Sequence, residues 1–118
     1  MRNDKENLII KLTFKFSIEI IAFSEKLRQL NKFEMASQLF RSGTYIGANI
    51  REVQNAESKA DFIHKFKIAL KECDETDYWL ATCENSTNMP SPPKDVREEN
   101  TEILKIMSKI VSKSKAAI

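Results

Sequence analysis

Glycine and proline are scarce in this sequence. Its 118 residues include two glycines and three prolines, well below average usage, which favours long helices over many-turned all-β folds. The length suits a single domain, with room for one hydrophobic core but not two. Because apolar residues make up 42% of the chain and charged residues 31%, the composition is that of a globular protein rather than a disordered one.

Cysteine and long apolar runs are also lacking. The two cysteines, Cys73 and Cys83, lie ten positions apart, which on one helix is about 15 Å of rise and too far for a disulfide. We expect both to be buried thiols in a reducing compartment. No run reaches the roughly 18 apolar residues of a membrane span, and the acidic residues in the first seven positions argue against a secretory signal. We therefore predict a cytoplasmic protein without membrane contact.

Apolar residues recur at helical spacing in the first segment, about residues 7–30. One row contains Leu8, Leu12, Phe16, Ile20, Phe23, Leu27 and Leu30. A second row beside it contains Ile10, Phe14, Ile18 and Ile21. Two rows make a wider apolar face than one helix partner needs. They predict contacts on two sides, within the fold and with another subunit. The segment is expected to end at residues 31–33.

Both glycines fall inside the second segment, about residues 34–56. Its apolar face contains Met35, Leu39, Ile46, Ile50 and Val53. A glycine inside a helix costs about 1 kcal/mol relative to alanine, so a close packing contact is expected to compensate. Gly43 and Gly47 are four residues apart, on one side of the helix. They predict a tight helix crossing.

The third segment, about residues 59–85, has the most regular pattern. Ser58 and Asp61 form a capping-box pattern at its start. A heptad seam follows, the signature of left-handed bundle packing: Phe62, Phe66, Ala69, Cys73, Thr76, Leu80 and Cys83.

A loop and a fourth helix complete the chain. Residues 85–93 contain all three prolines and cannot continue a helix. Helical spacing returns over about residues 95–114, in Ile103, Leu104, Ile106, Met107, Ile110 and Val111. Four helices, three connections and no strand signal predict an all-α, antiparallel up-down-up-down four-helix bundle. We expect it to be one domain that spans residues 1–118.

A single histidine limits the catalytic chemistry. Bundle cores bind metal pairs through Glu-x-x-His motifs and further glutamates, and Glu52, Glu72 and Glu75 raise that possibility. No glutamate precedes His64 by three residues, and nearby basic residues can neutralise the acids. Both glycines lie inside a helical pattern, so a phosphate-binding loop is absent. We expect no metal, no cofactor and no enzymatic activity.

Charge is distributed unevenly along the chain. Residues 1–33 and 94–118 carry net charges of +3 and +2, whereas residues 34–57 and 58–93 carry −1 and −2. Four lysines lie on the last helix with no acidic residue after Glu102: Lys105, Lys109, Lys113 and Lys115. Such a stripe is typical of a surface that follows a phosphate backbone. It is more often a solvated helix face, where cations are favoured near the C-terminus by the helix dipole.

Polar residues interrupt or flank the apolar rows of the central helices: Arg41, Asn49, Glu52, Lys71, Glu72 and Glu75. They predict an inter-helix network of ion pairs and hydrogen bonds that sets the register. The alternative interpretation is ligand recognition.

Two stretches of these central helices resemble a known family. One contains Gln38-Leu39-Phe40-Arg41-Ser42, then Ile46-Gly47-Ala48-Asn49-Ile50-Arg51-Glu52, then Ser58 with Asp61-Phe62. The other runs from Ala69-Leu70-Lys71-Glu72 through Glu75-Thr76 to Tyr78-Trp79-Leu80. Together they resemble the signatures of bacterial four-helix bundle proteins found in intervening sequences of 23S ribosomal RNA genes. The matched stretch spans residues 38–80.

The resemblance implies a four-helix bundle that forms a ring-like homopentamer. Relatives include the accessory variability protein of diversity-generating retroelements, which binds nucleic acid and a reverse transcriptase through a basic surface. Motif residues with an implied structural role are Arg41, Asn49, Glu52, Glu72 and Glu75, and the second signature adds Lys71, Tyr78 and Trp79. Two hypotheses follow. One is a non-catalytic oligomeric scaffold that offers a surface to RNA or an RNA-handling protein. The other is an interaction oligomer without a nucleic-acid role.

Overall fold

The first two helices are joined by a tight turn at Asn31. The computed structural model describes residues 4–116, in which α1 spans Asp4–Gln29 and α2 spans Phe33–Glu52. Asn31 has a left-handed φ of 63°, a conformation that asparagine tolerates better than most residues. The Lys32 N–H donates to the Leu27 carbonyl at 2.9 Å and the Asn31 N–H to the Arg28 carbonyl at 2.9 Å. This is the Schellman pattern of a helix C-terminus. The predicted break at residues 31–33 is confirmed.

The other two helices begin and end close to their predicted bounds. A short 3₁₀ helix, η1 (Val53–Asn55), follows α2, and α3 spans Lys59–Asn85 and α4 spans Val96–Ala116. The second helix therefore ends at Glu52 and not near residue 56, because the chain tightens into η1 and then extends at Ala56. The Ser58 side chain accepts a hydrogen bond from the Asp61 N–H at 3.0 Å, so the predicted cap is confirmed. Residues 4–116 contain no strand.

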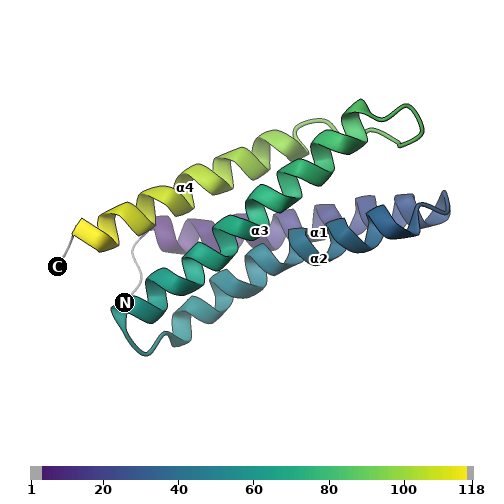
Figure 1. The fold of residues 1–118 in the computed structure, drawn as a ribbon. Helices are drawn as coiled ribbons and strands as arrows, with labels where there is room; N and C mark the ends of the chain where they lie inside the picture. The colour runs from purple at the N-terminus through teal and green to yellow at the C-terminus, as the bar shows by residue number, and fades with distance from the viewer. Residues whose placement is uncertain (1–3, 117–118) are drawn as a thin grey trace.

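The helices form an elongated body of about 49 × 21 × 20 Å. Figure 1 shows the α1–α2 turn and the α3–α4 loop at one end, and the α2–α3 turn at the other, where α1 begins and α4 ends. Each helix packs against two others, in the cyclic order α1, α2, α3, α4. The contact between α1 and α4 is the smallest of the four. Within residues 4–116, no helix has the length and hydropathy that a membrane crossing requires.

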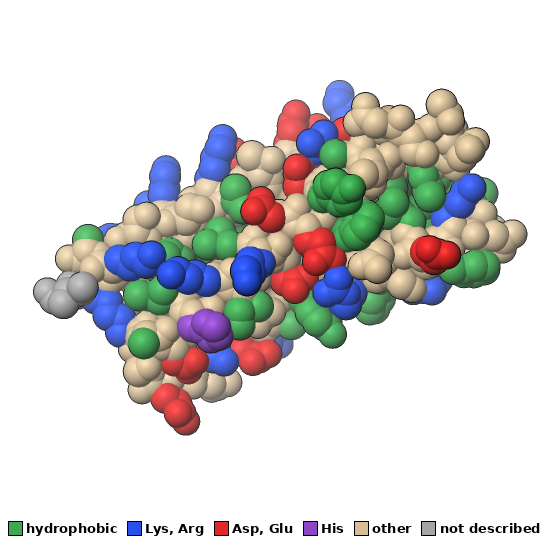
Figure 2. Space-filling model, viewed as in Figure 1, with side chains coloured by type: hydrophobic (Ala, Val, Ile, Leu, Met, Phe, Trp, Pro, Cys, Tyr) green, Lys and Arg blue, Asp and Glu red, His purple; other side chains and the backbone are tan. Residues whose placement is uncertain are grey.

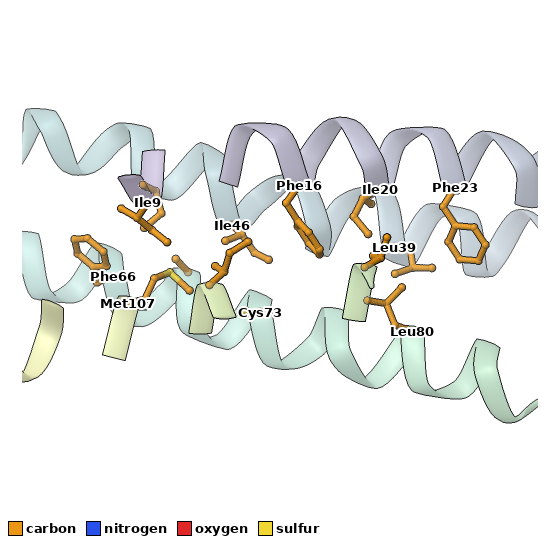
Figure 3. Close-up of a cluster of buried hydrophobic side chains, with 14 of the residues drawn as sticks. Ile9, Phe16, Ile20, Phe23, Leu39, Ile46, Phe66, Cys73, Leu80 and Met107 are labelled. Atoms are coloured by element: carbon orange, nitrogen blue, oxygen red, sulfur yellow. The ribbon is translucent and has the colours of Figure 1, made fainter. Parts of the chain in front are cut away.

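The core is one continuous cluster of apolar side chains along the bundle axis. Figure 3 shows Phe16 and Ile20 of α1 and Ile46 of α2 facing Cys73 and Leu80 of α3. All members of the predicted α3 seam are buried except Phe62, which is partly buried. Both cysteines are buried and free, as predicted. In α4 the buried apolar residues include Ile103, Met107, Ile110 and Val111, while Leu104 and Ile106 are partly buried.

The buried side of α1 coincides with neither predicted apolar row. Leu8 and Leu30 of the first row are 45% and 49% exposed, and Ile9, absent from both rows, is completely buried. The buried row is Ile9, Thr13, Phe16, Ile20, Phe23, Ser24 and Leu27. Apolar residues cover three sides of α1, so hydrophobicity alone does not identify the side that faces the core. On α2 the predicted Met35 and Val53 are only partly buried, while Ala36 is completely buried.

The two glycines allow α2 to approach α1 closely. A Cβ at Gly43 would lie 2.7 Å from Ile20 Cγ2, and a Cβ at Gly47 would lie 3.2 Å from the Thr13 carbonyl oxygen. Both distances are shorter than ordinary carbon contacts. The predicted tight crossing is confirmed, and its partner is α1.

Candidate functional site

The basic residues predicted on the last helix lie exposed along α4. Lys105, Lys109, Lys113 and Lys115 are all accessible to solvent, and Lys113 and Lys115 occupy the last turn. Lys67 of α3 lies close to Lys115, and its positive charge lowers the pKa of Lys115. Like charges are therefore gathered where α3 begins and α4 ends, and such a cluster attracts polyanions.

The positive charge of this lysine cluster is not neutralised by nearby carboxylates. Lys65, on the same helix as Lys67, pairs with Glu52 at 3.7 Å and with Asp61 at 3.9 Å. On α3 and α4, six lysines have no carboxylate within 4.0 Å of the ammonium group among residues 4–116: Lys67, Lys71, Lys105, Lys109, Lys113 and Lys115. We call these six residues the basic surface. Figure 2 shows one side of the molecule, on whose left half lysine and arginine side chains lie in a row above the histidine.

A polar network joins α2 to α3 on the surface of the bundle. Arg41 Nη2 donates to Glu75 Oε2 at 2.5 Å and to Gln38 Oε1 at 3.2 Å. Arg41 Nη1 lies 3.8 Å from Glu72 Oε2, and Trp79 Nε1 donates to Glu75 Oε2 at 3.1 Å. The sequence prediction of an ion-pair network is therefore confirmed for Arg41, Glu72 and Glu75. Trp79 extends it along α3.

Two carboxylates share the single arginine in this network. Burial and the charge of Glu75 raise the pKa of Glu72, although Arg41 opposes the shift. Glu72 Oε2 is buried without a hydrogen-bond donor in the described part of the chain. Within residues 4–116, no group of three or more His, Cys, Asp or Glu side chains is placed to hold a metal ion. This arrangement suits a structural ion pair between two helices.

The remaining predicted residues lie apart from that network. Asn49 Nδ2 donates to the Tyr45 carbonyl of its own helix at 2.8 Å, so its expected inter-helix bond is absent from the described residues. Glu52 reaches α3 through Lys65, whereas Lys71 is exposed on α3. Tyr78 is also exposed, with its ring edge-on to that of Trp79 at a centroid distance of 5.1 Å.

Sequence reasoning missed two contacts between α3 and α4. Arg97 donates to Asp77 Oδ1 at 2.8 Å and to Glu84 Oε1 at 2.9 Å. The buried Asn100 Nδ2 donates to the Cys73 carbonyl at 2.9 Å. The signal for Asn100 is present in the sequence, because Asn100 continues the heptad spacing of Val96, Ile103 and Met107 as a polar member. A polar residue at such a position indicates a hydrogen bond that specifies the register.

Comparisons with known proteins agree with this fold. The model of the family described as 23S rRNA-intervening sequence protein matches residues 5–110. The chain belongs to this family. It is also similar to a crystal structure of a protein of unknown function from the S23 ribosomal protein family of Bacteroides thetaiotaomicron VPI-5482, with 38% sequence identity and a TM-score of 0.85. That likeness covers 92% of this chain and 98% of the other. The search of curated proteins gave no match.

Family membership confirms the resemblance read from residues 38–80 and extends it over nearly the whole chain. The similarity to the Bacteroides protein lies well within the range that supports a shared all-helical fold. Neither comparison assigns a role to any residue of the basic surface or of the Arg41 network.

Proposed function

We propose that this family member is a non-catalytic scaffold that binds RNA through its basic surface. The observation that carries the proposal is the set of six exposed lysines without carboxylate partners within residues 4–116. Lys65 of α3 is paired with Asp61 four residues away, whereas the six lysines of the basic surface gather like charge on α3 and α4. The proposal includes an antiparallel up-down-up-down bundle, a cytoplasmic location, and assembly into a homopentameric ring that would repeat the basic surface around its rim.

Binding through this surface makes a quantitative prediction. Affinity for a labelled single-stranded RNA, measured by fluorescence anisotropy, should fall steeply with salt because phosphate contacts release counterions. The triple change Lys105→Glu, Lys109→Glu and Lys113→Glu should abolish binding. Replacing the three with Gln should lower the slope of log K against log salt by about 2.

A matched control distinguishes RNA binding at the basic surface from a general effect of net charge on RNA affinity. Lys26, Lys32 and Lys94 lie toward the opposite end of the bundle, near the α1–α2 turn and the α3–α4 loop. Changing these three to Glu alters the net charge by the same amount, and RNA affinity should fall far less. Equal loss in both triple variants, or salt-independent binding, would contradict the proposal. An oligomer with no RNA affinity would favour the alternative, an interaction protein without a nucleic-acid role.

The apolar surface supports the oligomeric part of the proposal. Phe14, Ile18 and Ile21, three of the four residues in the second row of α1, are 57%, 54% and 41% exposed, whereas Ile10 is partly buried against the core. A contiguous exposed apolar patch is typical of a protein interface. Light scattering should therefore show an oligomer at micromolar concentration, and a monomer would contradict this part.

A further inference from the structure

The outer face of α1 and α2 exposes large apolar side chains beside a groove with a small-residue floor. Phe14 and Phe40 line this groove of about 310 Å³, and Gly47 and Ala48 contribute to it. Of the described residues, Arg51 is the one charged residue that lines it, and its guanidinium carbon lies 5.9 Å from the centroid of the Phe14 ring. We call Phe14, Ile18, Ile21, Phe40 and Arg51 the apolar face.

A second groove lies between α1 and α4, where the helix contact is smallest. It measures about 400 Å³, and its apolar lining includes Leu8, Leu12 and Ile106. Four acidic residues line the same groove: Asp95, Glu98, Glu99 and Glu102. We call these four residues and the three apolar ones together the acidic groove.

The acidic groove carries excess negative charge. Among residues 4–116, the one cation that lines it is Lys15, which is already 2.9 Å from Glu99 Oε1 and 3.5 Å from Glu19 Oε1. Glu99 Oε2 is buried and has no hydrogen-bond partner in the described residues. A buried carboxylate oxygen of this kind is stabilised by a further donor. An apolar surface that carries a cation therefore complements this groove.

The apolar face has both properties. Pairing two acidic grooves would bring like charges together, which is unfavourable across an interface. Pairing the apolar face with the acidic groove instead places Arg51 beside carboxylates and removes the aromatic and aliphatic side chains from water. We propose that the apolar face of one copy of this chain docks into the acidic groove of the next copy.

This interface is heterologous, because two different surfaces of the same chain meet. Repetition of such a contact closes into a ring when the rotation between copies allows it. The inference rests on the proposed homo-oligomer and adds which surfaces meet. It is tested by two variants that each remove one surface at an exposed position: Ile18→Glu on the apolar face and Leu8→Glu in the acidic groove.

Each variant alone should be a folded monomer by light scattering and circular dichroism. A mixture of the two should form a one-to-one dimer, since the intact groove of the first meets the intact face of the second. Leu30→Glu, at an equally exposed site outside both surfaces, should leave the oligomer unchanged. If either glutamate variant fails to fold, Arg51→Glu and Glu98→Lys test the same pairing, with assembly weakened in each and restored on mixing.

Other outcomes overturn the inference. If Leu8→Glu keeps the wild-type oligomer while Ile18→Glu is monomeric, the apolar face pairs with itself. If both are monomeric and their mixture stays monomeric, the two surfaces do not meet. In either case the proposed oligomer survives, whereas a monomeric wild-type protein removes both the oligomer and this interface.

Discussion

Asn100 and Cys73 are hydrogen-bonded in both directions across the α3–α4 interface. Asn100 Nδ2 donates to the Cys73 carbonyl at 2.9 Å, and the Cys73 thiol lies 3.0 Å from Asn100 Oδ1. Asn100 is buried among apolar residues of α4. A buried polar pair of this kind specifies one alignment of two helices, because any shift along the axis leaves both groups without partners.

Removing the Asn100 side chain should destabilise the fold. We expect Asn100→Ala to lower the free energy of unfolding by about 2 kcal/mol, since it deletes buried hydrogen bonds and leaves a cavity. Urea denaturation of the purified protein measures this. Asn85→Ala is the control, because its side chain bonds to the Ala81 carbonyl at an exposed site, and its cost should stay below about 0.5 kcal/mol. Equal costs would contradict a special role for Asn100.

The close approach at Gly43 predicts sensitivity to a single methyl group. Gly43→Ala gains about 1 kcal/mol of helix propensity, but overpacking against the stiff Ile20 side chain should cost about 1–3 kcal/mol. We expect a net loss of stability in thermal or urea unfolding. Ile20→Ala removes the two closest atoms, Cγ2 and Cγ1, so the double variant should be more stable than the sum of the single effects predicts. Additive effects would show that the new methyl group does not meet Ile20.

The sequence predicted α3 better than α1 for a physical reason. Residues of α3 such as Phe66 and Leu80 follow a strict heptad with polar residues between them, so only one side can face a core. In α1, Leu8, Ile9 and Phe14 lie on three different sides, and all are apolar. Only the positions of the neighbouring helices decide that Ile9 is buried.

The sequence predicted which lysines of α4 form the candidate site, but not which lysines are neutralised by carboxylates. Periodicity alone places Lys105, Lys109 and Lys113 on one side of α4. Whether a lysine is neutralised depends on residues distant in sequence: Lys65 meets Glu52 of α2, whereas Lys67 meets Lys115 of α4. Such contacts follow from helix packing and cannot be read from spacing along one helix.

The two buried thiols should be unreactive and should make stability fall at alkaline pH. Burial raises the pKa of Cys73 to about 12 and that of Cys83 to about 11, from an ordinary value of 9.0. Above the ordinary value the unfolded chain loses these protons while the folded chain keeps them. The contribution is therefore complete below the unfolded pKa and is lost as pH rises towards the folded pKa.

The free energy of unfolding should fall by up to about 1.4 kcal/mol per pH unit for each thiol. Urea denaturation of wild type and Cys83→Ala at several pH values above 9.0 measures the difference, which should be a shallower slope in the variant. Iodoacetamide should modify neither cysteine in the folded protein and both in urea. Rapid alkylation of the folded protein would contradict the burial of the thiols.

The Arg41 network predicts a pH-dependent effect at the α2–α3 contact. The pKa of Glu72 is raised, chiefly by burial, so its charged form is disfavoured in the folded state. Stability from this group is complete below its ordinary pKa and declines as pH rises through the folded value. Arg41→Met removes the opposing cation and should lower stability near neutral pH by less than about 1 kcal/mol, because the guanidinium is partly exposed.

Adding Glu72→Gln to Arg41→Met should recover most of that loss, because one of the two unpaired carboxylates becomes neutral. The loss should also shrink in mildly acidic buffer, because the raised pKa of Glu72 favours its neutral form there. Urea denaturation of the wild type, both single variants and the double variant at the two pH values forms a complete cycle. A penalty for Arg41→Met that is independent of both pH and Glu72 would show that Arg41 stabilises the bundle through its hydrocarbon stem and not through its charge.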